Sequence, residues 1–549
     1  MVFKCDSEYK ILGKNNFIDS RGAIANFDLT QKINLIATIT SKKNTLRSNH
    51  YHPIQTQECL LIKGQYISIY KDLKNKNSSK ETHLINQGEL VVTKPNVAHT
   101  MIFTRDTVFV NLVKGDRDHK NYGKTHTIPY LLINEKEKEF LAKYYKFSCR
   151  ICDKNDFYRL LSLGYQPFAN NFLKRTTDIE KYPLEVNICK NCYNAQLSTS
   201  PDLNKIYKNY LYRSSVSKEF TSHFYFAAKK YIKLFKLKKN NLIVDIGSND
   251  GIALMQFKNM GFKNILGIEP SKRLSLECKK KGIKIINDFF KRSYAIKNKS
   301  KADLILATNV FAHNDNLSQM LKNIMLMLKK EGKIVIEVQY FIETLKKYSF
   351  DNIYHEHFNY WTLTALNNFF LNHACKIFKA EKINTHGGSL RIYATKNFKK
   401  KIQSSVKNII AEEKSFGLFS IKKYSKFKNK INNIKDNFSK NIIWLKKKYP
   451  NLVGYGASAK STVAINFFKL EEGYLNYMID DNISKQNHFI PGTKIKILKI
   501  NKLPKRKIDC ILVFAWNNFE EIKSNNINIS NKFVSVRDLY KNDFINSFR

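Results

Sequence analysis

The stretch LIVDIGSNDG, residues 242–251, joins an apolar segment to a short turn that contains glycines. The apolar side chains around Asp245 are typical of a buried β-strand, and a helical pattern follows from Ile252. Gly247 and Gly251 allow the backbone of the turn to approach a bound molecule, and the first amides of a helix have no partner within it. The stretch therefore predicts a strand, a ligand-binding turn and a helix in succession.

The surroundings of this turn predict a parallel α/β sheet, because strand and helix patterns alternate from about residue 220 to residue 395. The next strand ends at Glu269, about 20 residues after the turn, where a carboxylate can accept hydrogen bonds from both hydroxyls of a ribose. Dinucleotide-binding folds share this plan, but the turn lacks the G-x-G-x-x-G pattern.

The turn resembles the ligand-binding motif of the class I methyltransferases, which implies S-adenosylmethionine (SAM) as the cofactor. Asp288 follows the strand at residues 284–286 and is expected at the adenine end of SAM. Asn309 follows the strand at residues 304–306 and is expected to face the methyl donor. The predicted cofactor-binding residues are Asp245, Gly247, Asn249, Gly251, Glu269, Asp288 and Asn309.

The run YHEH, residues 354–357, places four titratable side chains in succession. Imidazole and carboxylate neighbours shift one another's pKa values toward neutrality, which suits proton transfer. A zinc site of the metalloprotease type needs histidines at positions i and i+4 of a helix, whereas His355 and His357 are two apart. The run is therefore interpreted as a proton-transfer cluster, and polar residues on a loop are the alternative.

Two C-x-x-C pairs, separated by an insert of about 36 residues, account for four of the nine cysteines. Four thiolates in this arrangement complete a tetrahedral zinc shell with no open position, so Cys149, Cys152, Cys189 and Cys192 are predicted to hold a structural zinc ion. Four unrelated buried thiols or a redox pair are the alternatives. The other cysteines lack such pairing and are expected to be packed side chains: Cys5, Cys59, Cys278, Cys375 and Cys510.

Residues 1–135 contain short apolar segments between turns, which predicts a β-rich domain. His50 and His52 are two apart, so in a strand both side chains point to one face and can enter the same cavity. The domain resembles the cupins, and more closely the RmlC-like cupins of sugar epimerases and ketoisomerases. Metal-binding cupins carry a glutamate where Gln57 stands here, so a metal-free or weakly metallated cavity is expected. Acid/base catalysis by the histidines and a binding or dimerisation role both stay open.

A second strand, glycine-rich turn and helix occupy residues 452–460, after a lysine-rich helical pattern at residues 397–450. The G-x-G-x-x-A pattern of this turn is a weak indication of a dinucleotide site. Diphosphate binding by the helix N-terminus and Lys460 is preferred, and NAD is the alternative.

The order of these motifs resembles the sugar C-methyltransferases of deoxysugar biosynthesis over residues 146–549. NVFAH at residues 309–313 and THGGSLR at residues 385–391 belong to the same pattern. Members of that family methylate nucleotide-linked 4-keto-6-deoxy sugars at C3, so the resemblance implies a nucleotide-diphosphate sugar as partner. It assigns catalytic roles to Tyr212, His313, Tyr354, Glu356 and His357, and substrate contacts to His386, Arg391, Tyr455 and Lys460, while the cupin resemblance adds His50 and His52.

Ordinary carbonyl chemistry then orders the catalytic roles. A 4-keto group acidifies the C3 proton, and His357 is the first choice for the base that removes it. Tyr354, His313 or Tyr212 are candidates to donate a hydrogen bond to the enolate oxygen. Glu356 either orients His357 or binds a sugar hydroxyl.

The sequence thus predicts a multidomain chain with a cupin β-barrel at residues 1–135 and a charged linker that starts near residue 134. A zinc module at residues 146–205, a class I SAM methyltransferase domain at residues 206–396 and a Rossmann-like α/β domain at residues 397–549 follow. A saccharide O- or N-methyltransferase and a non-catalytic SAM- and sugar-binding protein are the alternative functions. RmlC-like cupins are often dimeric, which implies a homodimer through this domain.

The net charge of +48 comes from lysines dispersed along all 549 residues, which is typical of a solvated surface. No nucleic-acid-binding motif accompanies the charge, so anionic small ligands are the expected partners. Neither a secretory signal nor an apolar stretch of membrane-spanning length, about 20 residues, is present. Together with the odd number of cysteines, this predicts a cytoplasmic protein.

Overall fold

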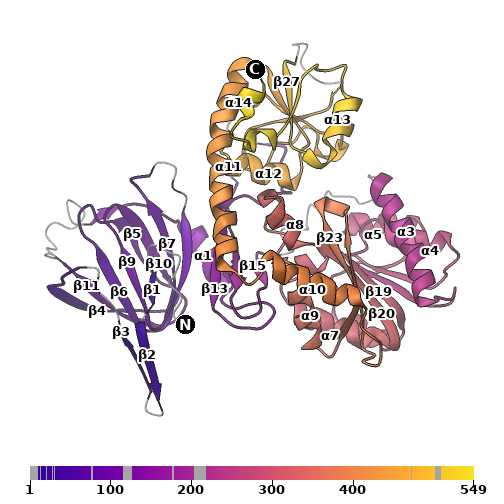
Figure 1. The fold of residues 1–549 in the computed structure, drawn as a ribbon, viewed down its shortest axis with the longest axis horizontal. Helices are drawn as coiled ribbons and strands as arrows, with labels where there is room; N and C mark the ends of the chain where they lie inside the picture. Colours follow the sequence, from indigo (N-terminus) through magenta and orange to yellow (C-terminus); the bar gives the residue numbers. More distant parts are fainter. Residues whose placement is uncertain are drawn as a thin grey trace. The chain divides into compact units, whose positions relative to one another are not determined.

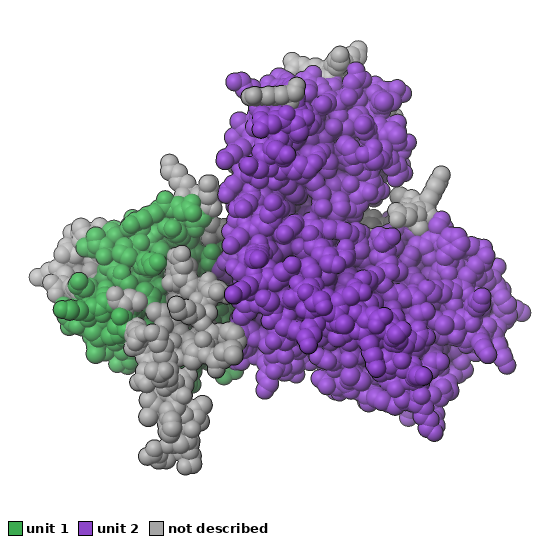
Figure 2. All heavy atoms as spheres, viewed as in Figure 1, with its two compact units in different colours: residues 1–147, 162–165, 182–185 green, residues 148–161, 166–181, 186–549 purple. Residues whose placement is uncertain are grey.

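The computed structural model describes residues 10–12, 14–19, 22–26, 29, 31–75, 78, 80–114, 127–175, 179–202, 218–470, 473–500 and 508–548. The chain divides into two compact units, which Figure 2 draws in green and purple. Unit 1 comprises residues 1–147, 162–165 and 182–185, and unit 2 comprises residues 148–161, 166–181 and 186–549.

Unit 1 contains two antiparallel sheets of five strands that enclose one apolar core. The first sheet has the order β1 (Lys10–Leu12), β9 (Glu89–Thr93), β6 (Gln57–Lys63), β11 (Thr107–Val113), β4 (Leu35–Ser41). The second has the order β12 (Ile128–Pro129), β5 (Leu46–Tyr51), β10 (Val97–Phe103), β7 (Gln65–Asp72), β8 (Glu81–Asn86). Strands β2 (Lys14–Asp19) and β3 (Gly22–Asn26) form a separate hairpin. This arrangement confirms the predicted β-barrel.

Alternation of side chains along the strands builds the barrel core. Cys59 and Leu61 of β6 belong to the core together with Tyr66 of β7 and Phe103 of β10. Gln57 lies on the same side of β6 as Cys59, and Glu58 points to the other side, as the spacing predicts. The glycine between β6 and β7, Gly64, has φ +97°, and a Cβ there would lie 2.5 Å from the carbonyl oxygen of Asp106.

The predicted charged linker at residue 134 is instead the start of helix α1 (Glu135–Tyr144). The side chain of Asn134 accepts a hydrogen bond from the backbone of Glu137, and the Glu137 carboxylate accepts one from the Asn134 amide. This capping box satisfies two backbone donors at the N-terminus of the helix. Charge alone indicated a linker, but the Asn-x-x-Glu spacing is a helix-start signal.

The zinc module contributes most of a four-stranded sheet with the order β13 (Phe157–Gln166), β14 (Tyr182–Cys189), β15 (Ala195–Leu197), β21 (Asn359–Tyr360). Strand β21 directly follows the YHEH run in sequence. Ala195 pairs with Tyr360 and Gln196 with Asn359, so the strand that follows the YHEH run shares one sheet with the cysteine-bounded segment.

The central domain is a seven-stranded sheet with the order β18 (Lys284–Ile286), β17 (Ile265–Ile268), β16 (Ile243–Ile246), β19 (Ala302–Thr308), β20 (Leu328–Gln339), β23 (Ser389–Thr395), β22 (Lys376–Ile383). The first five strands in this order, β18, β17, β16, β19 and β20, are parallel, and β23 is antiparallel to both of its neighbours. Around the sheet lie α3 (Lys218–Phe235), α4 (Ile252–Asn259), α5 (Lys272–Lys280), α6 (Arg292–Lys297), α7 (Leu317–Met327), α8 (Phe341–Lys346) and α9 (Leu363–Leu371) (Figure 1). The chain leaves β16 toward β17 and later returns to β19, which makes the end of β16 a topological switch point where ligands bind.

Two helices, α10 (Ser404–Phe416) and α11 (Ile421–Lys448), connect this domain to a second α/β sheet, as the lysine-rich pattern predicts. The five-stranded parallel sheet has the order β26 (Ile497–Leu498), β25 (Met478–Ile479), β24 (Leu452–Tyr455), β27 (Cys510–Val513), β28 (Phe533–Ser535). Its helices are α12 (Ala459–Phe467), α13 (Phe519–Asn525) and α14 (Phe544–Ser547). The predicted Rossmann-like fold is confirmed. Within the described residues, no helix is long and apolar enough to cross a membrane.

Candidate active site

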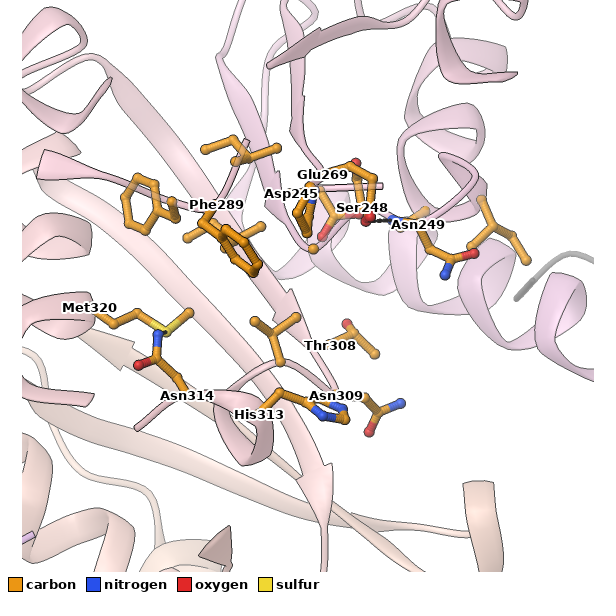
Figure 3. Close-up of a pocket in the computed structure, with 18 of the residues that line it drawn as sticks. Asp245, Ser248, Asn249, Glu269, Phe289, Thr308, Asn309, His313, Asn314 and Met320 are labelled. Atoms are coloured by element: carbon orange, nitrogen blue, oxygen red, sulfur yellow. Dashed lines mark hydrogen bonds between the residues drawn. The ribbon is translucent and has the colours of Figure 1, made fainter. Parts of the chain in front are cut away.

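A first cavity opens at the end of β16, where the LIVDIGSNDG stretch turns into α4 (Figure 3). Asp245, Gly247, Asn249, Glu269, Asp288 and Asn309 all line it. Figure 3 shows Asp245, Ser248, Asn249 and Glu269 together at one side, with Thr308, Asn309 and His313 at another. Six of the seven predicted cofactor-binding residues therefore meet in one cavity, and the seventh, Gly251, begins α4 beside it.

Positive φ angles shape the turn under this cavity. Gly247 has φ +69° and Gly251 has φ +79°, a backbone conformation that glycine adopts without strain. A Cβ at Gly247 would lie 2.5 Å from Val310, so the turn packs directly on the loop that carries Asn309. The hydroxyl oxygen of Ser248 is buried in this turn and has no hydrogen-bond partner among the described residues, which leaves it available to a ligand.

Two buried carboxylates give the first cavity its electrostatic character. Burial raises the pKa of Asp245 to about 8, and the neighbouring Glu269 and Glu337 add to the shift. Burial also raises the pKa of Glu269, although its carboxylate accepts hydrogen bonds from the amides of Asn249 and Ser271, each at 2.9 Å. Crowded carboxylates of this kind favour a cationic ligand, and SAM carries a sulfonium and an ammonium group. The residues present therefore fit SAM.

Asp288 lies at the rim of the same cavity beside Phe289. Burial opposes its ionisation, but hydrogen bonds from Lys291 at 2.6 Å and Tyr294 at 2.7 Å outweigh that effect and lower the pKa of Asp288. The carboxylate is thus ionised and held in place next to an aromatic ring, an arrangement suited to a purine base.

A second cavity adjoins the first. Tyr354, Glu356 and His357 of the YHEH run line it, together with Lys460 of the C-terminal domain. Asn309 and His313 line both cavities, so the two spaces share a wall at the NVFAH segment. A group bound in one cavity therefore lies next to a group bound in the other.

Within the second cavity, the phenol oxygen of Tyr354 lies 2.8 Å from Nε2 of His357. Their rings have centroids 4.0 Å apart, and the His313 ring lies 4.9 Å from that of His357. The backbone amide of His357 donates to the carbonyl of Tyr354, which closes a tight turn and brings the two side chains to one side. The run therefore presents a tyrosine–histidine pair that can exchange a proton.

The ring of His313 has a defined tautomer. Nδ1 lies 2.7 Å from the backbone carbonyl of Glu356, and because a carbonyl only accepts, Nδ1 carries the hydrogen. Burial lowers the pKa of His313 to about 4, although this hydrogen bond opposes the shift. The ring is therefore neutral near pH 7, and Nε2 is a hydrogen-bond acceptor.

Glu356 and Lys460 supply opposite charges to the second cavity. Burial raises the pKa of Glu356 to about 7, and a hydrogen bond from Asn170 at 2.6 Å opposes the shift. Nζ of Lys460 is shielded from solvent and has no hydrogen-bond partner among the described residues; it lies 5.1 Å from the centre of the Trp516 ring. Burial lowers the pKa of Lys460. A shielded amine without a partner favours an anionic ligand.

The four cysteines of the C-x-x-C pairs converge, and their sulfur atoms all lie within 4.8 Å of one another. Cys149 and Cys192 are 3.5 Å apart, as are Cys152 and Cys189, close to the separation of about 3.8 Å that zinc–sulfur bonds of about 2.3 Å impose in a tetrahedron. The two pairs have matching backbones: Asp153 (φ +57°) and Tyr193 (φ +58°) each follow a pair directly. The donor set and geometry fit a structural zinc ion.

Arg150, inside the first C-x-x-C pair, ties the zinc module to the methyltransferase domain. Its buried guanidinium donates to Asp315 at 2.7 Å and to the carbonyls of Leu197 and Thr199. Asp315 follows the NVFAH segment by two residues, so this ion pair connects the cysteine cluster to the shared wall of the two cavities.

Other predicted site residues lie elsewhere. Arg391 of β23 donates to Glu337 at 2.6 Å, and Tyr455 of β24 donates to Asp481 at 2.7 Å; neither lines one of the two cavities. His386 belongs to a short 3-10 turn at Thr385–Gly387, and Tyr212 lies outside the described residues. The substrate contacts assigned to Arg391, Tyr455 and His386 stay predictions.

In unit 1, His50 and His52 meet a third histidine, His99 of β10, which pairs with His50 across the strands. The ring centroids are 4.7 to 5.4 Å apart, and the ligand nitrogens of all three lie within 4.8 Å. Burial, with His52 nearby, lowers the pKa of His99 to about 3, so this ring is neutral. The two predicted histidines thus lie side by side, and the cluster adds a third that the two-residue spacing could not locate.

The sequence motifs also missed residues of the two cavities that come from distant segments. Phe220 and Phe224 of α3 line the first cavity, and Asn170, Gln339 and Asn352 line the second. The phenylalanines have the pattern of ordinary apolar positions of a helix. The amides carry no local pattern, although Asn352 lies only two residues before the YHEH run, and this proximity is a signal that could have identified it.

Family models match three successive parts of the chain. Residues 149–207 match "Putative zinc binding domain", residues 219–377 match "Methyltransferase domain", and residues 384–535 match "C-methyltransferase C-terminal domain". The C-methyltransferase NovU of Streptomyces niveus is 25% identical over 384 residues, which are 69% of this chain and 91% of that protein. These matches confirm the family resemblance, the zinc module and SAM as cofactor.

Two solved structures are similar to the N-terminal part. The dTDP-4-dehydrorhamnose 3,5-epimerase from Sulfolobus tokodaii is 17% identical and covers 23% of this chain and 79% of its own, with a TM-score of 0.20. A 3,4-ketoisomerase from Helicobacter canadensis is 18% identical and covers 25% of this chain and 97% of its own, with a TM-score of 0.20.

Proposed function

Because this chain belongs to the SAM-dependent C-methyltransferases with a zinc-binding domain, we propose that it methylates C3 of a nucleotide-linked 4-keto-6-deoxy sugar. The observation that carries the proposal is the wall shared by the two cavities, formed by Asn309 and His313. The first cavity suits a cationic methyl donor. The second contains acid/base groups and a lysine, as a carbonyl compound linked to a diphosphate requires.

SAM supplies an electrophilic methyl group when it occupies the first cavity. The acceptor must then supply a carbanion, and C–H acidity next to a ketone provides it. In the second cavity, Tyr354 and His357 form the pair that takes the C3 proton: the phenol oxygen and Nε2 are 2.8 Å apart, so the proton comes to rest on the imidazole. The C3–H bond breaks and its electrons pass into the enolate; the enolate carbon would then form the new C–C bond to the methyl group while the bond between that methyl and sulfur breaks, its electrons staying on the neutral thioether that leaves.

His313 is one of the three candidate donors to the enolate oxygen, and its hydrogen bonding excludes it from that role. Because Nδ1–H is committed to the Glu356 carbonyl and the ring is neutral, Nε2 accepts hydrogen bonds and does not donate to the enolate oxygen. Tyr354, the ammonium of Lys460 and the amides of Gln339 and Asn352 are among the donors that line this cavity. His313 instead orients a hydroxyl of the sugar or the run itself.

Lys460 and the N-terminus of α12 form the part of the second cavity that binds the diphosphate. Ser458 caps this helix through a capping box, and both Ser458 and Lys460 line the second cavity. NAD is the alternative ligand of this glycine-rich turn, in which the amide of Ala457 donates to Asp480 at 2.7 Å.

The cupin domain is proposed to bind, isomerise or epimerise a sugar of the same class. Its three clustered imidazoles include at least one neutral ring, that of His99, which is the form a general base needs. The cluster also has the spacing of a metal site, and elemental analysis of the purified chain distinguishes a metal-binding cluster from a general base.

The test is incubation of the full chain with SAM and a panel of nucleotide-linked 4-keto-6-deoxy sugars in deuterium oxide. The proposal expects deuterium uptake at C3 without SAM and a methyl group at C3 with it. A wild-type protein that binds SAM but gives neither would disprove C-methylation and favour a binding protein. Methylation of oxygen or nitrogen without C3 exchange would favour the saccharide O- or N-methyltransferase.

A further inference from the structure

The zinc module contributes a side chain to the second cavity. Asn170 lies in the insert between the two C-x-x-C pairs and lines this cavity together with Phe172. Its Nδ2 donates to Oε1 of Glu356 at 2.6 Å, across 186 positions of sequence. We infer that Asn170 is a positioning residue that holds the Glu356 carboxylate in place at the acceptor. The inference rests on the proposed function, in which Glu356 contacts or organises the sugar.

The turn that carries Asn170, residues 167–173, has a fixed shape. The amide of Asn171 donates to the carbonyl of Phe168 at 3.1 Å, and the amide of Phe172 donates to that of Asn170 at 3.0 Å. Ala169 and Phe172 are buried on either side of the half-buried Asn170. These contacts hold the backbone of Asn170 in place independently of its side-chain contact with Glu356.

The turn is also held from two sides within unit 2. On one side, the Phe168 ring packs edge-on against His355, the residue before Glu356, at 5.4 Å between centroids. On the other side, the carbonyl of Leu173 accepts a hydrogen bond from Phe489 of the C-terminal domain at 2.9 Å. The turn that carries Asn170 therefore contacts both the YHEH run and the C-terminal domain.

The contact has an electrostatic consequence. An N–H donor stabilises the ionised carboxylate, so Asn170 opposes the rise that burial causes in the pKa of Glu356. The other titratable or charged groups that line this cavity are His313, Tyr354, His357, Lys460 and Lys485. Because the hydrogen bond that opposes the shift comes from the Asn170 amide, its loss is expected to raise the pKa of Glu356 beyond about 7.

Asn170→Ala is the test variant, and Asn171→Ala is its matched control in the same turn. For Asn170→Ala, kcat is expected to fall about 10- to 100-fold, the range for a lost hydrogen bond to a charged group. The acidic limb of the pH profile of kcat/KM is expected to move to higher pH. Zinc content and SAM affinity should match the wild type in both variants, which shows that each one folds, and Asn171→Ala should keep both kcat and the pH profile.

A double-variant cycle with Glu356→Gln separates positioning from general structure. If Asn170 acts through Glu356, Asn170→Ala in the Glu356→Gln background gives little further loss of kcat. An equal fold-loss in both backgrounds, or an unmoved pH profile in Asn170→Ala, would overturn the inference.

A readout without substrate separates failure of this inference from failure of the proposed function. The folded-state pKa of Glu356 lies above its ordinary value, so its contribution to stability is present at low pH and is lost as pH rises through about 7. Without Asn170 this loss extends to higher pH, so the unfolding temperature of Asn170→Ala should fall further below wild type between pH 7 and 8, but not in the Glu356→Gln background. If the protein methylates no sugar but Asn170→Ala shows this pH-dependent drop in unfolding temperature, only the proposed function is refuted. If the drop is absent, the contact between Asn170 and Glu356 is refuted.

Discussion

The phenol oxygen of Tyr354 and Nε2 of His357 lie 2.8 Å apart in a cavity that shares Asn309 and His313 with a second cavity lined by buried carboxylates. This distance is that of a normal hydrogen bond between a hydroxyl and an imidazole nitrogen. A proton can therefore move between the two residues, so they act as one unit in the removal of an acidic C–H proton.

Tyr354→Phe keeps the ring packed on His357 and removes only the hydroxyl. We expect kcat for methyl transfer to fall about 10²- to 10⁴-fold, the usual range for loss of a general acid/base group. SAM affinity, measured by calorimetry, should stay within about twofold because Tyr354 lines only the second cavity. Tyr449→Phe, at the C-terminal end of α11, is the control. Wild-type turnover by Tyr354→Phe would remove the pair from the mechanism.

SAM affinity should depend on pH through Asp245, whose pKa is about 8 in the free protein. A bound cation favours the ionised carboxylate, so binding releases a proton below pH 8. Affinity should rise with pH toward about 8, by at most about tenfold per unit, and then level off. Calorimetry in buffers of different ionisation enthalpy measures the proton release. Asp245→Asn should flatten the dependence and Asp436→Asn, exposed on α11, should retain it; a pH-independent affinity in the wild type would contradict the assignment.

Lys460→Met removes the shielded amine from the second cavity while keeping its length. We expect KM for the nucleotide sugar to rise about 10- to 100-fold, because the diphosphate loses a charge-assisted contact, with SAM affinity unchanged. Lys440→Met, exposed on α11, is the matched control. An unchanged KM in Lys460→Met would place the diphosphate elsewhere.

Loss of zinc should disturb the YHEH run, because the strand that follows this run pairs with a strand of the zinc module. Elemental analysis of the purified chain should give one zinc ion per four-cysteine cluster, and Cys189→Ser should abolish it. Because β21 pairs with β15, we expect Cys189→Ser to lose methyl transfer. Cys510→Ala, a buried thiol outside the cluster, should keep its zinc. Full activity in a zinc-free Cys189→Ser protein would show that the module is dispensable.

The cupin histidines can be tested without disturbing unit 2. In full-length protein, His50→Asn with His52→Asn should abolish any sugar isomerisation or epimerisation seen with SAM absent, while C-methylation of a directly usable sugar persists. Nuclear magnetic resonance of the sugar protons distinguishes the two reactions. Loss of both activities in this variant would contradict independent sites.

The local sequence was sufficient to predict those parts of the site whose functional groups are neighbours along the chain. The turn around Gly247, the C-x-x-C pairs and the YHEH run each carry their geometry in consecutive residues, because strand, turn and helix fix the positions of side chains a few residues apart. For the same reason, the approach of His50 to His52 followed from the two-residue period of a strand.

Packing decided the contacts between distant segments. Arg391 belongs to a motif assigned to substrate, yet its guanidinium is engaged by Glu337 on the adjacent strand. Asn170 lies in a stretch without any motif, yet it donates to Glu356. Neither partner could be chosen from the sequence, since many carboxylates and amides are equally available to a chain before it folds.

The sequence by itself determined the chemistry of this protein: a SAM turn, a zinc ligand set and a titratable run in a fixed order. Only the tertiary structure decided that the methyl-donor cavity and the YHEH cavity share Asn309 and His313, and that the neutral His313 ring turns an acceptor nitrogen away from the Glu356 carbonyl. The physical reason is that residue type determines which hydrogen bonds a group can form. Burial and the pairing of distant strands determine which partner the group contacts and whether it is protonated.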